Sequence, residues 1–234
     1  MNYKTIISVL AIILFSMESF AQETKEVNVN TFNEIRLEGS AHWILIPSEN
    51  EKVIIESKSE EVFNYIKVEN NGQALVISTT EKAKNITKLF KSVTIKVYFS
   101  SLNSISLGGV GSVTMENVTT TNDLKTNLKG TGSMNLSINC TDFIGNIYGT
   151  GSLSIKGAAT NSTIRVEGVG NFEGYDFTTV ETKVTVSGVG GAQVYAAETL
   201  TATINGVGSI RYKGDPKTKN FNSNGLGSIK ESKD

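Results

Sequence analysis

The sequence is poor in the residues that usually stabilise exported domains or carry out catalysis. Its 234 residues include one cysteine, Cys140, two prolines and one histidine, His42. A single cysteine excludes an intramolecular disulfide, so stability must come from packing and backbone pairing. Cys140 ends an alternating run that begins at Met134. We expect a buried thiol on a strand, because free cysteine is among the most buried residue types.

An excess of charge of either sign is also missing. The chain has 22 Lys and Arg against 23 Asp and Glu, which gives a formal net charge of −1. Nucleic acids and anionic membrane surfaces attract proteins through a positive field, which a near-neutral chain does not provide. We therefore expect neither as a partner.

Long apolar runs are absent beyond the N-terminus. Lys4 precedes an apolar stretch from Ile6 to Phe15, and Ser19-Phe20-Ala21 follows with small residues where a signal peptidase cleaves. The stretch is short for a membrane span, which takes about 20 apolar residues. We therefore predict a signal peptide over residues 1–21. The mature chain would be exported, to the periplasm or outer surface of a Gram-negative bacterium, with no membrane span after cleavage.

Glycine, in contrast, is abundant, with 22 residues, and much of it recurs in one motif. The motif is Gly-x-Gly followed by Ser, Asn or Gly, and its spacings are 21, 19, 19, 20, 18 and 19 residues. Its first glycines are Gly109, Gly130, Gly149, Gly168, Gly188, Gly206 and Gly225. So regular a period indicates a repeat architecture in which neighbouring repeats complete one another's core.

Three apolar columns accompany the motif. Two residues before its first glycine stand Leu107, Leu128, Ile147, Val166, Val186, Ile204 and Ser223. Between the glycines stand Val110, Thr131, Thr150, Val169, Val189, Val207 and Leu226. Four residues after the first glycine stand Val113, Met134, Leu153, Phe172, Ala192, Ile210 and Ile229. Alternation with Ser, Thr, Asn and Lys is typical of strands with one buried face, so we expect all three columns to line the interior.

The apolar parity shifts across each glycine pair, which indicates that the chain bends there. Glycine suits such a corner because it adopts positive φ and lets backbones approach closely. We therefore predict an all-β fold: a parallel β-solenoid over residues 101–234, with seven coils stacked about 4.8 Å apart. A propeller is disfavoured, because its blades need about 40 residues each.

Residues 22–100 are also rich in strand patterns but lack the glycine period. Apolar alternation recurs from Phe32 to Ile55 and from Val93 to Phe99, and Asn70-Asn71-Gly72 is a tight-turn signal. Because this region runs directly into Leu102 and the first corner, we expect it to form a non-repetitive β region that packs on the first coil and caps it.

These patterns together resemble those of a known family. The pattern Phe32-x-x-Ile35-x-Leu37-x-Gly39, the strand to Ile55, Leu75-x-Ile77 and the Gly-x-Gly series are similar to the putative autotransporter adhesin head, or GIN, domain. The resemblance covers about residues 29–229. It implies a right-handed single-stranded β-helix in an exported protein of Bacteroidetes-type bacteria, and no established activity, cofactor or catalytic residue.

A polar column is the first candidate binding feature. Seven residues before successive corners stand Asp123, Asp142, Asn161 and Glu181, followed by Thr199 and Thr218. Stacked in neighbouring coils, these side chains suit a cation site or a row that contacts a saccharide. The simpler interpretation is a row of turn residues, because Asp and Asn hydrogen-bond their own backbone in turns.

Two tyrosines form the second candidate. Tyr175 and Tyr195 stand seven residues after their corners, one coil apart. Exposed tyrosines stack on sugars or anchor partners, whereas paired aromatics also stabilise sheets. We take His42 to be a satisfied strand residue. No catalytic triad, metal-spaced cluster or phosphate loop accompanies these columns, so we expect no enzyme activity, no cofactor and no metal.

Three function hypotheses remain open. The first is a non-enzymatic envelope or surface module with an adhesin-like binding or structural role and a glycan or envelope protein as partner. The second is a carbohydrate-active β-helix enzyme, a lyase or a hydrolase. The third is self-assembly through the solenoid ends. The last repeat ends in the polar tail Lys230-Glu231-Ser232-Lys233-Asp234, and Lys219 and Ser223 replace apolar residues. Polar terminal repeats cap solenoids, so we expect a monomer.

Overall fold

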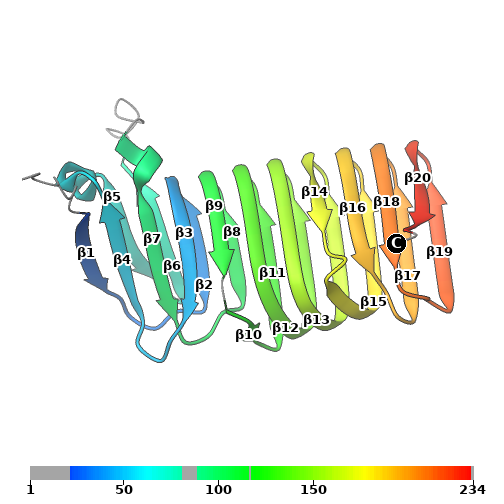
Figure 1. Ribbon diagram of the computed structural model, residues 1–234, viewed down its shortest axis with the longest axis horizontal. Coiled ribbons are helices and arrows are strands. Elements are labelled where there is room, and N and C mark those ends of the chain that lie inside the picture. The colour runs from blue at the N-terminus through cyan, green and yellow to red at the C-terminus, as the bar shows by residue number, and fades with distance from the viewer. Residues whose placement is uncertain (1–21, 81–88, 116, 233–234) are drawn as a thin grey trace, which may run out of the picture.

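A computed structural model describes residues 22–80, 89–115 and 117–232. The predicted signal peptide, residues 1–21, lies outside the described residues. The described chain is an all-β parallel solenoid of about seven turns, so the predicted fold class is confirmed. Its strands stack along one long axis, with β1 near one end and β19 and β20 at the other (Figure 1).

Each glycine corner joins two walls of the solenoid. We call pre-corner wall the strands that lead into a corner, and post-corner wall the strands that leave it. The pre-corner strands include β8 (Ser104–Leu107), β11 (Asp123–Leu128), β15 (Phe177–Val186), β17 (Thr199–Ile204) and β19 (Thr218–Ser223). The post-corner strands include β9 (Val110–Met115), β14 (Val169–Glu173), β16 (Val189–Tyr195), β18 (Val207–Lys213) and β20 (Leu226–Glu231).

Two long strands belong to both walls. β12 (Thr131–Ile147) and β13 (Thr150–Val166) leave one corner, bend, and reach the next corner without a break. The short strand β10 (Thr119–Thr120) pairs with the middle of β12. All pairings between neighbouring coils are parallel and keep the repeat register, so that Gly132 pairs with Gly111 on one side and Gly151 on the other.

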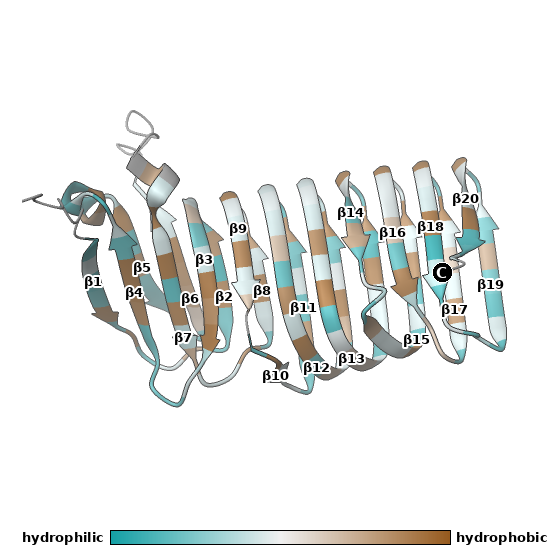
Figure 2. Cartoon of the chain, viewed as in Figure 1, coloured by the Kyte–Doolittle hydropathy of each residue, from teal (hydrophilic) through white to brown (hydrophobic). Residues whose placement is uncertain are grey.

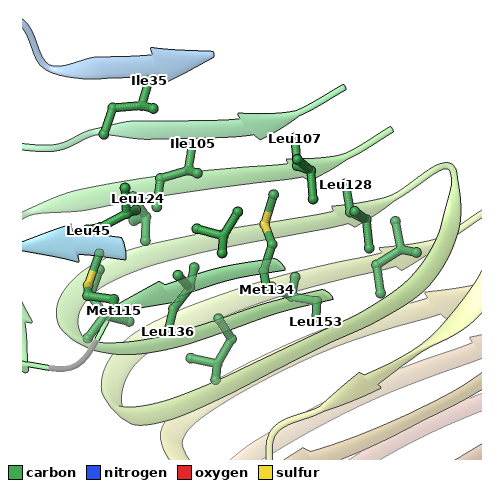
Figure 3. Packing of buried hydrophobic residues seen from close by; sticks show 14 of the residues in the cluster. Ile35, Leu45, Ile105, Leu107, Met115, Leu124, Leu128, Met134, Leu136 and Leu153 are labelled. Atoms are coloured by element: carbon green, nitrogen blue, oxygen red, sulfur yellow. The ribbon is translucent and has the colours of Figure 1, made fainter. Parts of the chain in front are cut away.

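Two of the three apolar columns line the interior as predicted. The column before each corner, from Leu107 to Ile204, is fully buried, and only its last member, Ser223, is exposed. The column from Val113 to Ile210 is equally buried. Figure 3 shows Leu107 and Leu128 above Met134 and Leu153 in one shared core. Apolar and polar residues alternate along the strands (Figure 2).

The third column faces the solvent, and the expectation that it is buried is wrong. Val110, Val169, Val189 and Val207 are 50–55% exposed, and Leu226 is 76% exposed. The cause is the pleat. The glycines on either side face the stacked backbone of the preceding coil, and successive residues of a strand point to opposite faces. The residue between the glycines must therefore point outward.

Both expected reasons for glycine apply: close approach to the preceding coil at both glycines of the motif, and positive φ at the second glycine only. A β-carbon on the first glycine, Gly168, would lie 2.1 Å from the carbonyl oxygen of Gly149, so this position requires close approach. The second glycine carries positive φ in four coils, including +155° at Gly132 and +149° at Gly190. L-residues with a side chain rarely adopt this conformation.

The N-terminal region contributes its own strands to the stack, in an order that differs from the sequence. β2 (Glu34–Glu38) pairs in parallel with β8 on one side and β6 (Ala74–Thr79) on the other. β3 (Ser40–Pro47) likewise lies between β9 and β7 (Thr94–Phe99). Gly39 joins β2 to β3 at a corner that stacks on the corner at Gly109. The repeat spacing alone did not reveal this further corner.

Antiparallel strands cover the N-terminal end. β4 (Lys52–Ser57) pairs with β7, and β1 (Glu23–Asn28) pairs with β4. β5 (Ile66–Asn71) forms a hairpin with β6, and Gly72 in its turn has φ +64°, which confirms the predicted turn. The 3-10 helix η1 (Glu60–Asn64) buries Val62, and the 3-10 helix η3 (Leu89–Ser92) buries Phe90.

One hydrophobic core runs from Phe32 in the N-terminal region to Tyr212 near the C-terminal end. The N-terminal strands and the glycine coils therefore bury their apolar faces against each other. Among the described residues, no helix has the length and hydropathy needed to cross a membrane.

Candidate functional site

The predicted polar column forms one continuous row at the start of the pre-corner strands. Its order, fixed by parallel pairing, is Asp123, Asp142, Asn161, Glu181, Thr199 and Thr218. The first four side chains are exposed, and Asn161 Nδ2 donates a 2.8 Å hydrogen bond to Asp142 Oδ1. No three His, Cys, Asp or Glu of the described chain are grouped to hold a metal ion. Contact of this row with a ligand stays a prediction.

Cys140 lies beside this row and is half-buried rather than fully buried. It packs against the edge of the core. Burial raises the pKa of the Cys140 thiol to about 11, and the negative charges of Asp142 and Asp123 add to the effect. The thiolate is the reactive form of cysteine, so this environment disfavours reaction at Cys140.

The two predicted tyrosines are half-buried, and residues from later coils lie against both rings. The Lys213 ammonium lies 5.2 Å from the ring centroid of Tyr175. The Tyr195 ring lies against Gly214, where a β-carbon would be 3.3 Å from Tyr195 Cζ. This geometry favours the interpretation that the two aromatic rings cover the edge of the coil. It does not favour an open platform on which sugars could stack. Ligand contact by either ring stays a prediction.

His42 is a satisfied strand residue, as predicted. It lies on the outer side of the post-corner wall, where its Nδ1 is 2.5 Å from Ser112 Oγ. Ser112 belongs to a column of small polar residues that continues through Ser133 and Ser152. His42 and Ser112 therefore stand at the start of a row of polar side chains along this wall.

A groove on the outer side of the pre-corner wall was not foreseen from the sequence. Three adjacent strands form it: β2, β8 and β11. The central strand carries short residues, Ser104, Ser106 and Gly108, and these form the floor. The volume of this open groove is about 550 Å³. No local signal marks the groove, because one of its walls belongs to the N-terminal region and reaches β8 only through tertiary pairing.

The two walls of the groove carry long polar side chains. The wall on β2 consists of Glu34, Arg36 and Glu38, and the wall on β11 consists of Lys125, Asn127 and Lys129. Register places Glu34 opposite Lys125 across Ser104, and Arg36 opposite Asn127 across Ser106.

Charge is unevenly distributed between these walls. Arg36 and Glu34 form a 3.2 Å ion pair, with both side chains substantially exposed. Lys125 and Lys129, in contrast, make no ion pair with any other described residue. The charged residues of the β11 wall are therefore both cations, whereas the β2 wall carries charges of both signs.

Hydrogen bonds outside the groove hold Asn127 in place. The buried Asn146 on the next strand donates from Nδ2 to Asn127 Oδ1 at 3.1 Å, and Arg165 Nη1 donates to Asn146 Oδ1 at 3.4 Å. The amide of Asn127 thus has a defined orientation at the centre of the β11 wall.

Comparison with known proteins agrees with this architecture. Residues 31–216 match the family described as "Putative auto-transporter adhesin, head GIN domain", and the chain belongs to this family. A search of curated proteins gives no match. The crystal structure of a putative adhesin from Bacteroides fragilis is similar, with 28% identity and a TM-score of 0.86 over 91% of this chain and 97% of that one.

Two solved structures from Parabacteroides distasonis share the fold. One is a putative adhesin, with 20% identity and a TM-score of 0.66. The other is a putative lipid binding protein, with 22% identity and a TM-score of 0.70. Each match covers 91% of this chain and 97% of the other.

Proposed function

We propose that the mature chain is a non-enzymatic binding module of the cell envelope or cell surface, with an adhesin-like role. The observation that carries the proposal is the polar groove on the rigid pre-corner wall, which offers hydrogen-bonding and charged groups to a ligand from a surface paired on both sides. Membership of a putative adhesin family and the likeness to the Bacteroides fragilis protein support it. The predicted signal peptide supports export.

The surface, rather than the interior, is the site of binding in this proposal. Buried aliphatic and aromatic side chains fill the solenoid from Phe32 to Tyr212. A lipid of the kind suggested by the name of one Parabacteroides distasonis structure would have to bind on the outside. Apart from the exposed valine column at the corners, the outer walls are largely polar, which favours hydrophilic partners such as glycans.

The test compares binding with turnover on the same purified protein, residues 22–234. We expect saturable binding in a glycan array or to envelope extracts, and no cleavage of common polysaccharides with or without Ca²⁺. Robust polysaccharide cleavage that is abolished by Asp142→Ala would contradict this proposal and support the hypothesis of a carbohydrate-active enzyme. Failure to bind any glycan or envelope fraction would leave a purely structural role.

A further inference from the structure

We propose that the groove between β2 and β11 binds a single chain of an acidic polysaccharide that contains uronate sugars. This inference rests on the proposed function and deepens it by naming a ligand class and a site. It starts from three features of the groove: its shape, the difference between its two walls, and its rigid floor.

The shape of the groove suits one extended chain. Neighbouring strands are spaced about 4.8 Å apart, so the backbones of β2 and β11 are separated by about 10 Å across β8. Along the strand, the floor from Ser104 to Gly108 extends over about 13 Å, at roughly 3.3 Å per residue. These dimensions fit a segment of a linear oligosaccharide that lies parallel to β8 and across the rod axis.

The β11 wall selects for anions. Lys125 and Lys129 point to the same side of the strand, because they are separated by an even number of residues. Neither ammonium has an ion-pair partner among the described residues. A ligand with carboxylates repeated along its length would supply the missing partner to both. A neutral glycan would leave both charges unpaired.

The β2 wall selects for hydroxyl groups. Ionised carboxylates are hydrogen-bond acceptors only, so Glu38 and the Glu34 oxygen that is not paired with Arg36 require donors. Sugar hydroxyls donate to carboxylates, whereas a polyanion without hydroxyls would place its charge against these two residues. A uronate chain carries a carboxylate and several hydroxyls on each ring, and therefore satisfies both walls at once.

The floor is rigid and polar. Ser104 and Ser106 offer hydroxyls that both donate and accept. Their strand is paired on both sides, with β2 and with β11. Binding therefore requires little ordering of the backbone, which reduces the entropic cost of association.

Isothermal titration calorimetry with polygalacturonate, at low salt, tests the inference on residues 22–234. We expect Lys125→Ala/Lys129→Ala to weaken binding by more than about tenfold. The matched control Lys156→Ala/Lys230→Ala, which removes two exposed lysines from the post-corner wall, should keep the affinity within about twofold. Ser106→Gln fills the floor without changing charge and should also weaken binding. Thermal melting verifies that each variant folds.

Four results would overturn the inference. An equal loss of affinity in both lysine double variants would show that polygalacturonate is attracted non-specifically to positive charge. Equal affinity for neutral dextran would remove the role of the carboxylates, and equal affinity for polyglutamate would remove the role of the hydroxyls. If an envelope fraction binds but polygalacturonate does not, the inference about the groove is wrong, whereas the proposed function is still supported.

Discussion

A β-carbon on Gly109 would lie 1.9 Å from the carbonyl oxygen of Gly39, the corner residue of the neighbouring coil. The two glycines are distant in the sequence, but β2 and β8 are paired, and so are β3 and β9. The contact leaves no space for any side chain. The same relation recurs at the first glycine of every later corner, where a β-carbon would meet a carbonyl oxygen of the preceding coil at 1.9–2.1 Å.

We predict that Gly109→Ala lowers the free energy of unfolding by about 1–3 kcal/mol, because the two backbones must separate to admit the methyl group. The adjacent Gly108 is the matched control. A β-carbon there would have its nearest contact at 3.8 Å, and its φ is not positive. Gly108→Ala should therefore melt like the wild type. Equal melting temperatures for the two variants would contradict the close-approach argument.

A second pair of variants tests the orientation of the columns at one corner. Val186 is fully buried before the corner, whereas Val189 is 52% exposed between its glycines. Val186→Thr buries a hydroxyl in the apolar core and should cost about 1–3 kcal/mol. Val189→Thr should stay within about 0.5 kcal/mol of the wild type, as exposed substitutions do. Urea denaturation measures both, and a reversed order would refute the outward position of Val189.

The raised pKa of Cys140, about 11 against an ordinary 9.0, predicts slow alkylation. At about pH 8 the folded protein should react with iodoacetamide roughly a hundredfold more slowly than the urea-unfolded chain, because the rate follows the thiolate fraction. Between about pH 7 and 9.5 the rate should rise with pH without reaching a plateau. Asp142→Asn should raise the rate only slightly, since burial is the larger cause. Full recovery of the ordinary rate in that variant would assign the effect to charge instead.

We predict that the mature protein is a monomer, because its C-terminal coil is capped by polar and charged groups. Lys219 and Ser223 pair with Leu200 and Ile204 and stand at their inward positions. The Lys219 ammonium lies 3.8 Å from Asp215 Oδ1 and 5.7 Å from the ring centroid of Tyr212. Charged residues at inward positions oppose pairing of an exposed sheet edge with another chain.

Light scattering across a concentration series measures this state. A constant monomer mass is the expected result, although Phe221 is 43% exposed and Leu226 76% exposed at this end. A dimer or filament that disappears in Ile229→Lys would instead identify the open end as an interface. That outcome would favour the self-assembly hypothesis.

Much of the solenoid could be predicted from local spacing. The glycine period places Leu107, Leu128 and Ile147 in one column, because parallel coils of nearly equal length must stack in register. The same arithmetic places Asp142 beside Asn161, and their hydrogen bond follows from that register. These relations depend only on strand periodicity and repeat length, both of which are written along the chain.

Side-chain direction at the corners could not be predicted in the same way. Val189 is apolar and lies in a regular column, as Val186 does, yet the two point to opposite sides. Hydropathy indicates only that a column is apolar. Which way it faces depends on how the backbone passes the glycines, and that is decided by the close contact with the preceding coil.

The sequence by itself therefore determined the period, the glycine corners and the two columns that line the interior. Only the tertiary structure decided that β2 and β3 lie between strands that follow them in the sequence. It alone assembles the groove, whose walls bring Glu34 opposite Lys125. The physical reason is that pairing between distant strands is selected by the fit of whole apolar faces and backbones, and no local pattern encodes that choice.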